Sequence, residues 1–502
     1  MKTRLMLALI AAVPLAAQAT DGYFANGYGM KSIGMGGAAA AVAQEPFGGA
    51  VNPGAMSFLG NEWQFGVSWF SPHRDASRTG SGQAGIDGYA DSDSTNFFIP
   101  EFGINWKYSP ELAFGVTVYG NGGMNTDYPG GQISNQSACT AIWGNRPVGP
   151  YNLLCGTGKP AGTTDNLGVD LMQLIIAPYA SWQFTKGQSI GIAPVIAYQR
   201  FKAEGLQAFA PFSTSPANLT NNGYSDAWGF GVRVGYMGQF SDQFAIGASW
   251  QSKTSMGNFE GYKGLFAQQG GFDIPSNFTA GIAVRPTNQW LIALDYERIF
   301  YDDAPSVNNP SALLGYCAQG VVANCLGGNN GAGFGWQNVD VWKIGVQYML
   351  DDRWTLRAGF NHSDNPIRPQ DVTFNILAPG VVKDQYSAGM TYRIDPQSEI
   401  TGAFMYAANN SVTGPSLFIG FGAPPTTTET IAMKQYLLGV AYSRKFGPRL
   451  PRAARGGEQS MRRRAHSCPP RSASATRAAR CRSIPQFRQG DIRCALLRWS
   501  LR

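Results

Sequence analysis

The sequence predicts an all-β protein, namely a 14-stranded antiparallel transmembrane β-barrel with an N-terminal plug inside its lumen. Three observations lead to this fold class. Apolar and polar residues alternate along fourteen segments, and the connections between these segments are alternately short and long. The 502-residue chain is also rich in glycine (63 Gly) and has only 14% charged residues. Typical soluble domains carry about a quarter of charged residues, so the composition disfavours a chain of ordinary soluble domains.

Residues 1–19 have the features of a secretory signal peptide. Lys2 and Arg4 form a basic start, Leu5 to Leu15 form a short apolar core, and Ala17-Gln18-Ala19 is a typical cleavage site. The apolar run is too short to cross a bilayer as a helix. We therefore expect cleavage after Ala19 and export of the mature chain.

The barrel is expected between residues 63 and 446, where apolar and polar residues alternate. In the first segment Phe65 and Trp69 alternate with Gln64 and Ser68, and a period of two places such residues on opposite faces of a strand. The same pattern predicts strands near 63–71, 97–108, 111–120, 169–185, 189–203, 225–240, 244–256, 274–286, 289–301, 336–350, 353–363, 382–394, 398–409 and 431–446.

The connections between these segments alternate in length. Six are turns of two or three residues, such as Ser109-Pro110 and Asp351-Asp352, and seven are long, namely 72–96, 121–168, 204–224, 257–273, 302–335, 364–381 and 410–430. Outer-membrane barrels show this asymmetry, with tight periplasmic turns and long external loops. Ten of the twelve Trp lie in or at the ends of the segments, where barrels place aromatic girdles. A soluble exported barrel or propeller is the alternative.

Residues 20–62 precede the barrel and do not alternate. They are small and rich in Gly and Ala, so this segment cannot form a core of its own. A 14-stranded barrel is wide enough to leave an open channel unless something fills it. We therefore expect a plug (hatch) inside the lumen, with a flexible linker as the alternative.

Several motifs resemble the FadL/TodX family over about residues 20–446. They are the segment from Gly29 to Ala38 (GMKSIGMGGA), Asn52-Pro53, Asp295-Tyr296, the run from Arg357 to Asn361 (RAGFN), and Asn365-Pro366. The family's hatch usually reads Asn-Pro-Ala, whereas Gly54 here separates Pro53 from Ala55. Members are 14-stranded outer-membrane transporters of long-chain fatty acids and other hydrophobic compounds. The resemblance implies a monomer in the outer membrane of a Gram-negative bacterium, surrounded by lipid and lipopolysaccharide and inserted by the barrel-assembly machinery.

The last segment, residues 447–502, differs in composition from the rest. It holds 14 Arg and two acidic residues, which is a net charge of +12, so the remainder of this +7 chain is acidic. The basic isoelectric point therefore indicates no nucleic-acid partner for the body. We interpret the tail as disordered or out-of-frame sequence that could mask a C-terminal assembly signal, with a basic RNA- or lipid-binding arm as an alternative.

Two long loops contain apolar residues where polar ones would be expected. We predict that they form an exposed groove that captures a hydrophobic ligand, with mutual packing of the loops as the alternative. A second pocket is expected between plug and lumen. The residues are Leu206, Phe209, Pro211, Phe212, Phe259, Tyr262, Leu265, Phe266 and Phe272 for the groove and Phe24, Met30, Ile33 and Met35 for the second pocket.

Gly120-Asn121-Gly122-Gly123 ends the third predicted strand. Glycines there weaken strand pairing and permit a bulge. The family resemblance implies a kink that opens a lateral exit into the bilayer, whereas a simple loop entrance is the alternative. We therefore hypothesise passive, ligand-gated uptake of long-chain fatty acids or of aromatic or aliphatic hydrocarbons, because no nucleotide site supplies energy.

The remaining reactive residues indicate structure more than chemistry. An exported chain favours disulfides, and the spacing predicts the pairs Cys139–Cys155 and Cys317–Cys325. His362 is followed by Ser363, but neighbours on a strand face opposite sides and cannot form a catalytic pair. We expect no enzyme activity, cofactor or metal site. A general porin, an adhesin barrel and an outer-membrane lipid hydrolase remain as rival functions.

Overall fold

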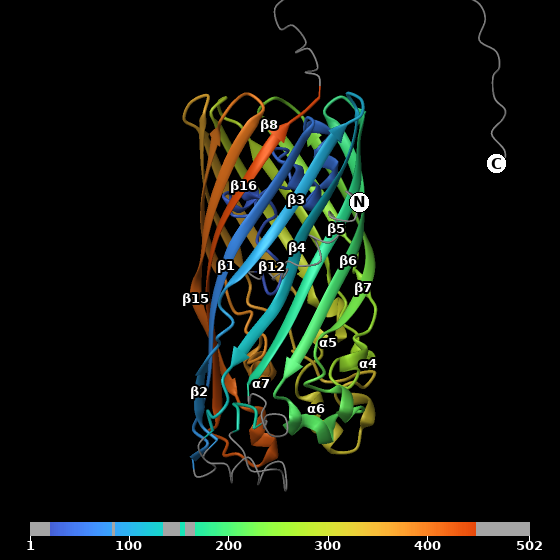
Figure 1. The fold of residues 1–502 in the computed structure, drawn as a ribbon, viewed down its shortest axis with the longest axis vertical. Coiled ribbons are helices and arrows are strands. Elements are labelled where there is room, and N and C mark those ends of the chain that lie inside the picture. The colour runs from blue at the N-terminus through green and yellow to red at the C-terminus, as the bar shows by residue number, and fades with distance from the viewer. Residues whose placement is uncertain (1–20, 83–85, 134–150, 156–165, 448–502) are drawn as a thin grey trace, which may run out of the picture. The chain divides into compact units, whose positions relative to one another are not determined.

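The fold is a closed antiparallel β-barrel in which each of the fourteen barrel strands pairs with two neighbours (Figure 1). The computed structural model describes residues 21–82, 86–133, 151–155 and 166–447, so the expected signal peptide and nearly all of the Arg-rich tail lie outside the described residues. The fourteen barrel strands are β1 (Glu62–Thr79), β3 (Phe97–Lys107), β4 (Leu112–Tyr128), β5 (Leu167–Thr185), β6 (Gln188–Glu204), β7 (Ser225–Gln239), β8 (Phe244–Gln251), β10 (Ser276–Val284), β11 (Trp290–Phe300), β12 (Val339–Met349), β13 (Trp354–Ser363), β14 (Asp384–Arg393), β15 (Ser398–Pro415) and β16 (Thr428–Lys445).

The last strand closes the sheet onto the first. β16 pairs with β15 on one side and with β1 on the other, so that Glu62 lies opposite Lys445 and Thr79 lies opposite Thr428. A closed sheet leaves no unpaired strand edge facing lipid. Two short strands, β2 (Gly88–Asp91) and β9 (Ser255–Met256), add to β1 and β7. The predicted fold class and strand number are confirmed.

The two faces of the barrel follow the predicted alternation. On β1 the side chains of Gln64 and Ser68 are 1% exposed, whereas Phe65 is 51% and Trp69 is 36% exposed. The outward face is thus apolar and the inward face polar, which suits a wall with lipid outside. Aromatic pairs such as Trp290–Tyr348 lie beside the short turns, with ring centroids 4.6 Å apart.

Short and long connections are sorted to opposite ends of the barrel (Figure 1). The long ones carry single helical turns: η4 (Gln207–Phe212), η5 (Pro216–Asn218), η6 (Glu260–Tyr262), α4 (Ala267–Gly270), η7 (Tyr301–Asp303), α5 (Pro305–Asn308), α6 (Leu313–Ala318), η8 (Val322–Asn324), η9 (Pro369–Asp371), α7 (Val372–Asn375) and η10 (Leu417–Phe421). Among the described residues, no helix has the length and apolar character needed to cross a membrane.

Four strands extend further toward the long loops than predicted. β1 and β4 continue to Thr79 and Tyr128, β15 continues to Pro415, and β16 already begins at Thr428. In these extensions polar residues occur on both faces, so the alternation that marks a lipid-facing strand is lost. Backbone pairing nevertheless continues there, because ladder hydrogen bonds do not depend on the side chains. The predicted strand 244–256 is instead split, since β8 ends at Gln251 before β9 begins.

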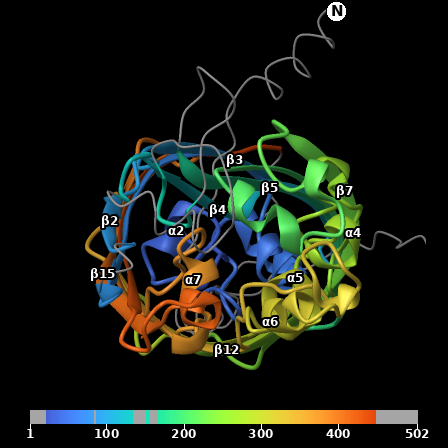
Figure 2. The same cartoon turned by 90° about the horizontal axis from the view of Figure 1, so that it is seen from below.

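The N-terminal segment, residues 21–61, lies inside the lumen and is called the plug below (Figure 2). It contains α2 (Met30–Ile33), η1 (Pro46–Ala50) and η2 (Pro53–Phe58). Its backbone lies directly against glycines of the wall. A Cβ atom at Gly247 would lie 1.8 Å from the carbonyl oxygen of Ala40, and one at Gly359 would lie 2.0 Å from the amide nitrogen of Gly36. Any larger residue at these positions would push the plug away.

Polar side chains of the wall bind the plug backbone. The carboxylate of Asp295 on β11 accepts hydrogen bonds from the amides of Ala39 and Ala40, at 2.7 and 2.8 Å. Within the plug, Asn52 donates to the carbonyl of Ala40 at 2.7 Å and to that of Tyr236 on β7 at 2.8 Å. Buried backbone groups need such partners. Asn52 and Asp295, both singled out by the family motifs, therefore position the plug.

The glycine contacts generate a prediction. Gly247→Val places a branched side chain against the carbonyl of Ala40, whereas Gly402→Val is a matched control whose Cβ would have its nearest neighbour 3.9 Å away. We expect Gly247→Val to displace the plug and lower the fraction of heat-modifiable folded barrel on gels by half or more, with increased leakage of a small sugar into liposomes. Equal behaviour of the two variants would contradict this packing.

Candidate ligand-binding site

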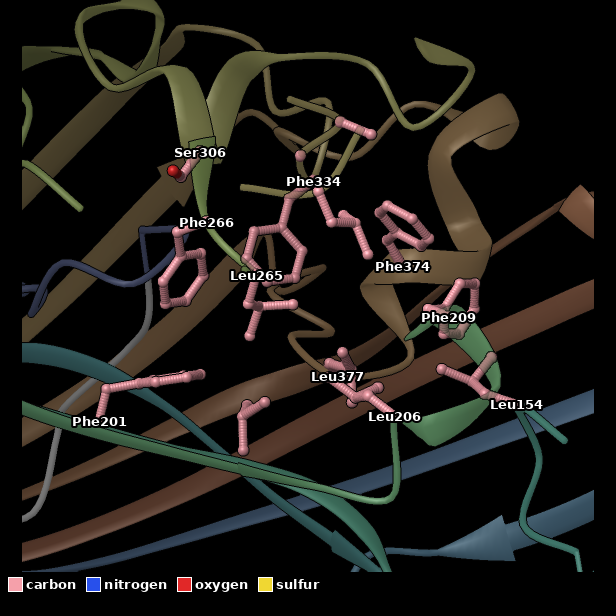
Figure 3. A pocket seen from close by; sticks show the side chains of 14 residues that line it. Leu154, Phe201, Leu206, Phe209, Leu265, Phe266, Ser306, Phe334, Phe374 and Leu377 are labelled. Carbon is pink, nitrogen blue, oxygen red and sulfur yellow. The ribbon is translucent and has the colours of Figure 1, made fainter. Parts of the chain in front are cut away.

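An apolar cavity lies beneath the long loops and is called the outer pocket here. Its volume is about 40 Å³, which has room for only a few water molecules. Figure 3 shows side chains from separate loops converging on this space. The lining residues are Leu154, Val169, Phe201, Leu206, Phe209, Leu265, Phe266, Ser306, Leu326, Ala332, Gly333, Phe334, Phe374 and Leu377.

The expectation of an exposed groove on the two apolar loops is wrong. Leu206, Phe209 and Phe266 are at most 5% exposed, because the loops fold over each other and over β6. Phe266 packs against Phe201 with ring centroids 4.7 Å apart. Removing this much aromatic surface from water is favourable. Four of the predicted residues, with Leu265 the fourth, nevertheless meet around one cavity.

The other predicted loop residues do not line the outer pocket. Phe212 is half-buried and packs against Phe421, with centroids 5.3 Å apart. Phe259 is fully buried behind Phe201 and Phe266. Pro211 lies inside η4, and Tyr262 and Phe272 are fully buried. These residues support the loops that form the pocket.

Sequence reasoning missed several lining residues, because it treated each loop separately. Phe201 belongs to β6, Phe334 to the loop between β11 and β12, and Phe374 to α7. Phe374 meets Phe209 edge to face, with centroids 5.7 Å apart. Apolar residues in the other long loops could have indicated these positions, because apolar side chains in external loops also tend to be buried.

Disulfides lie next to two lining residues of the outer pocket. Cys317 and Cys325 are joined in a disulfide, and Leu326 follows directly. Cys155, which follows Leu154, is also disulfide-bonded, but its expected partner Cys139 lies outside the described residues. The disulfides restrict the chain where it contributes to the pocket.

The predicted plug residues divide into two groups. Met30, Ile33 and Met35 are fully buried, with Met30 packed toward Gly439 and Met35 toward Gly345 of the wall, and they line no cavity among those described. Phe24 does line one, called the inner cavity here. This cavity lies between plug and wall and is polar. It is lined by Phe24, Ala25, Gly27, Tyr28, Gly37, Ala50, Val51, Arg233, Asn277, Thr279, Glu297 and Lys343.

Charges in the inner cavity are largely paired. The ammonium group of Lys343 lies 2.7 Å from Glu297 and 3.7 Å from the plug residue Asp21. Burial raises the pKa of Asp21 to about 6, while the charge of Lys343 opposes this rise. Arg233 donates to the hydroxyl of Tyr119 at 3.2 Å. The inner cavity therefore connects plug and wall through ion pairs.

A β-bulge interrupts β4 at the predicted glycine-rich position. Gly120 pairs with Leu174 and Gly122 with Gln173, which leaves Asn121 as the extra residue. β4 does not end there, as the sequence suggested, but continues to Tyr128. The side chain of Asn121 points inward, where it accepts from the hydroxyl of Tyr28 at 3.1 Å.

β3 and β4 separate just before the bulge. They pair only as far as Phe102 opposite Val118. Beyond this point, the described contacts of the β4 edge come from the plug and a loop: the amide of Ala25 donates to Asn121 at 3.2 Å, and that of Asp93 donates to Asp127 at 2.8 Å. We call this part of the wall the β3–β4 gap.

The histidine considered for catalysis lies apart from its neighbouring serine. His362 is 2.7 Å from Asp384 at an exposed position, whereas Ser363 is fully buried and donates to the carbonyl of Asp364 at 3.0 Å. Within the described ranges, no group of three or more His, Cys, Asp or Glu residues is arranged to hold a metal ion. The arrangement at His362 fits a polar rim of the barrel.

Comparison with known proteins decides the family. The model described as "Outer membrane protein transport protein (OMPP1/FadL/TodX)" matches residues 143–446. The chain belongs to this family. The expected family and the expected outer-membrane location are thereby confirmed, and as a family member the chain is a transport channel for hydrophobic substrates. No curated protein matches the sequence significantly.

Solved structures agree on the fold of this family member. The toluene transporter TodX of Pseudomonas putida matches with a TM-score of 0.58 at 18% identity, covering 84% of this chain and 99% of that one. A FadL homologue of Pseudomonas aeruginosa matches with a TM-score of 0.59 at 13% identity, covering 85% and 100%. The toluene transporter TbuX of Ralstonia pickettii matches at 0.53 and 17%, covering 84% and 99%.

The outer pocket generates a second prediction. Phe209→Ala and Phe266→Ala each remove a ring that lines it, whereas Phe212→Ala removes a ring of the same loops that does not. Because burying an aromatic side chain contributes about 1.5–3 kcal/mol, we expect the first two variants to bind a hydrophobic fluorophore roughly tenfold more weakly. Titration of the purified protein measures this, and an equal loss in Phe212→Ala would refute the assignment.

Proposed function

We propose that this channel takes up hydrophobic compounds passively: they enter the outer pocket, pass the plug and leave sideways through the β3–β4 gap. The lining of the outer pocket carries the proposal. Of its fourteen residues only Ser306 has a polar side chain, and its hydroxyl already donates to the carbonyl of Gly271 at 2.6 Å. An apolar solute gains free energy by entering such a site from water.

The small volume of the outer pocket supports gating by the ligand. At about 40 Å³ it must widen before it can hold a hydrocarbon ring. The walls that must move are single helical turns, such as η4 and α7. A ligand that binds only the widened form shifts the loops toward it. Diffusion down the concentration gradient then supplies the driving force.

The plug argues against the alternative of a general porin. A porin keeps a water-filled channel, whereas residues 21–61 occupy the lumen here and are mostly buried. A solute that cannot pass straight through needs another route. The β3–β4 gap supports a lateral one, because its edge on β4 is held by two residues of the plug, Phe24 and Ala25.

The proposed function predicts selective uptake. A transporter-deficient Gram-negative host that produces the full chain should take up a labelled long-chain fatty acid or alkylbenzene faster than the same host without it. A labelled small sugar should enter equally slowly in both hosts. Phe209→Ala and Phe266→Ala should reduce hydrophobic uptake roughly tenfold, in line with their binding loss. Rapid entry of the sugar would instead identify a porin.

The lateral route predicts a separate effect of the bulge. Deleting Asn121 removes the extra residue and lets β4 pair continuously with β5 through this region. We expect this deletion to slow uptake at least fivefold while fluorophore binding at the outer pocket stays unchanged. Asn121→Ala keeps the bulge and is the matched control. Normal uptake by a folded deletion variant would rule out the β3–β4 gap as the exit.

A further inference from the structure

Arg74 is a buried cation on the inner face of β1. Its side chain is 5% exposed, and one of its terminal nitrogens donates to the carbonyl of Ser94 at 2.9 Å. Among the described residues, no carboxylate lies within the 4.0 Å of an ion pair with Arg74. The nearby Asp170 acts on it only from a greater distance and is itself bonded to Tyr224 and Asn125.

Arg78 lies four residues further along the inward face of β1, and its charge is compensated. It forms an ion pair with Glu429, with its Nε atom 2.7 Å from the carboxylate, and it donates to the carbonyls of Ile86 and Leu153. Buried charges are normally compensated in this way. A guanidinium has five N–H donors, so Arg74 retains donors for a further partner.

Arg74 lies on the proposed route from the outer pocket to the β3–β4 gap. It lines a small cavity together with plug residues Gly22 and Tyr23 and with Gly123 to Asn125 of β4, just past the bulge. Ala378, Pro379 and Gly380 also line this cavity. That segment directly follows Leu377, which lines the outer pocket. Arg74 is therefore placed between the outer pocket and the β3–β4 gap.

We propose that Arg74 is a specificity-determining residue, which binds the carboxylate of a hydrophobic acid on its way from the outer pocket to the β3–β4 gap. This inference rests on the proposed function and adds the charge of the preferred substrate. A guanidinium matches a carboxylate with two parallel hydrogen bonds. An aliphatic or an aromatic acid offers the same group.

Three other buried cations of the lumen suit this role less well. Lys343 already has Glu297 and Asp21 as partners. Arg233 lines the inner cavity together with Glu297, whose negative charge repels an acid. Lys31 is paired with Glu399 and lies 4.0 Å from Glu62. Arg74 is the cation on the proposed route that lacks a nearby carboxylate among the described residues.

The test compares acids with uncharged compounds of the same skeleton. Initial uptake rates are measured in the transporter-deficient host for labelled dodecanoate and dodecanol, and for 4-butylbenzoate and butylbenzene. We expect Arg74→Met to slow both acids roughly tenfold, since charge-assisted hydrogen bonds are the strong ones, and to change the uncharged compounds less than twofold. Arg74→Lys keeps the charge without the planar fork and should be intermediate. If Arg74→Met slows the uptake of only one of the two acids, that acid shows whether the preferred substrate is aliphatic or aromatic.

A matched control separates binding from folding. Arg353→Met removes an exposed cation of the short turn between β12 and β13, at the end of the barrel opposite the long loops, and should leave all four rates unchanged. Folding is checked by heat-modifiable mobility on gels.

The outcomes distinguish the alternatives. Equal slowing of acids and uncharged compounds by Arg74→Met would show a structural role, and no slowing would overturn the proposal. If the unmodified protein takes up only the uncharged compounds, this inference fails while the proposed function stands; if it takes up none, the proposed function itself fails.

Discussion

The plug depends on a wall that satisfies its buried polar groups, and the rest of the structure depends on the plug. A backbone inside a lumen loses its water, so each amide needs a protein acceptor. Asp295 supplies one carboxylate for two consecutive plug amides, while Asn52 links the plug to itself and to β7. Glycines such as Gly247 and Gly359 let the two backbones come close enough for these bonds.

A filled lumen changes what the barrel can do. The lumen holds separate small cavities, among them the apolar outer pocket beneath the loops and the small cavity at Arg74 near the β3–β4 gap. The first attracts a molecule by its apolar surface, and the second offers a positive charge. Because Phe24 and Ala25 of the plug border the bulged strand, the segment that blocks the lumen also lies at the proposed exit.

Strand number, strand order and the sorting of loops were predictable because their signals are local. Apolar residues at every second position, such as Phe65 and Trp69, indicate that one side of the strand faces lipid. A two-residue connection requires that the two strands it joins form a hairpin. The prediction failed where this signal ends: β1 and β16 continue past the lipid-facing part, with Thr79 opposite Thr428. Exposure of the loop residues was also wrong, because Phe209 and Phe266 find partners from other loops.

The sequence by itself determined the β-barrel wall, the presence of a plug and the glycine-rich position of the bulge, because each depends on a pattern of residues that are close in sequence. Only the tertiary structure decided which side chains surround the outer pocket and which buried cation has no carboxylate partner among the described residues. Arg78 finds its counter-charge in Glu429, 351 residues away, whereas Arg74 on the same face of β1 has no ion-pair partner in the part of the chain that the structure describes. Such pairings arise when the last strand closes onto the first, a contact between distant segments that no local pattern encodes.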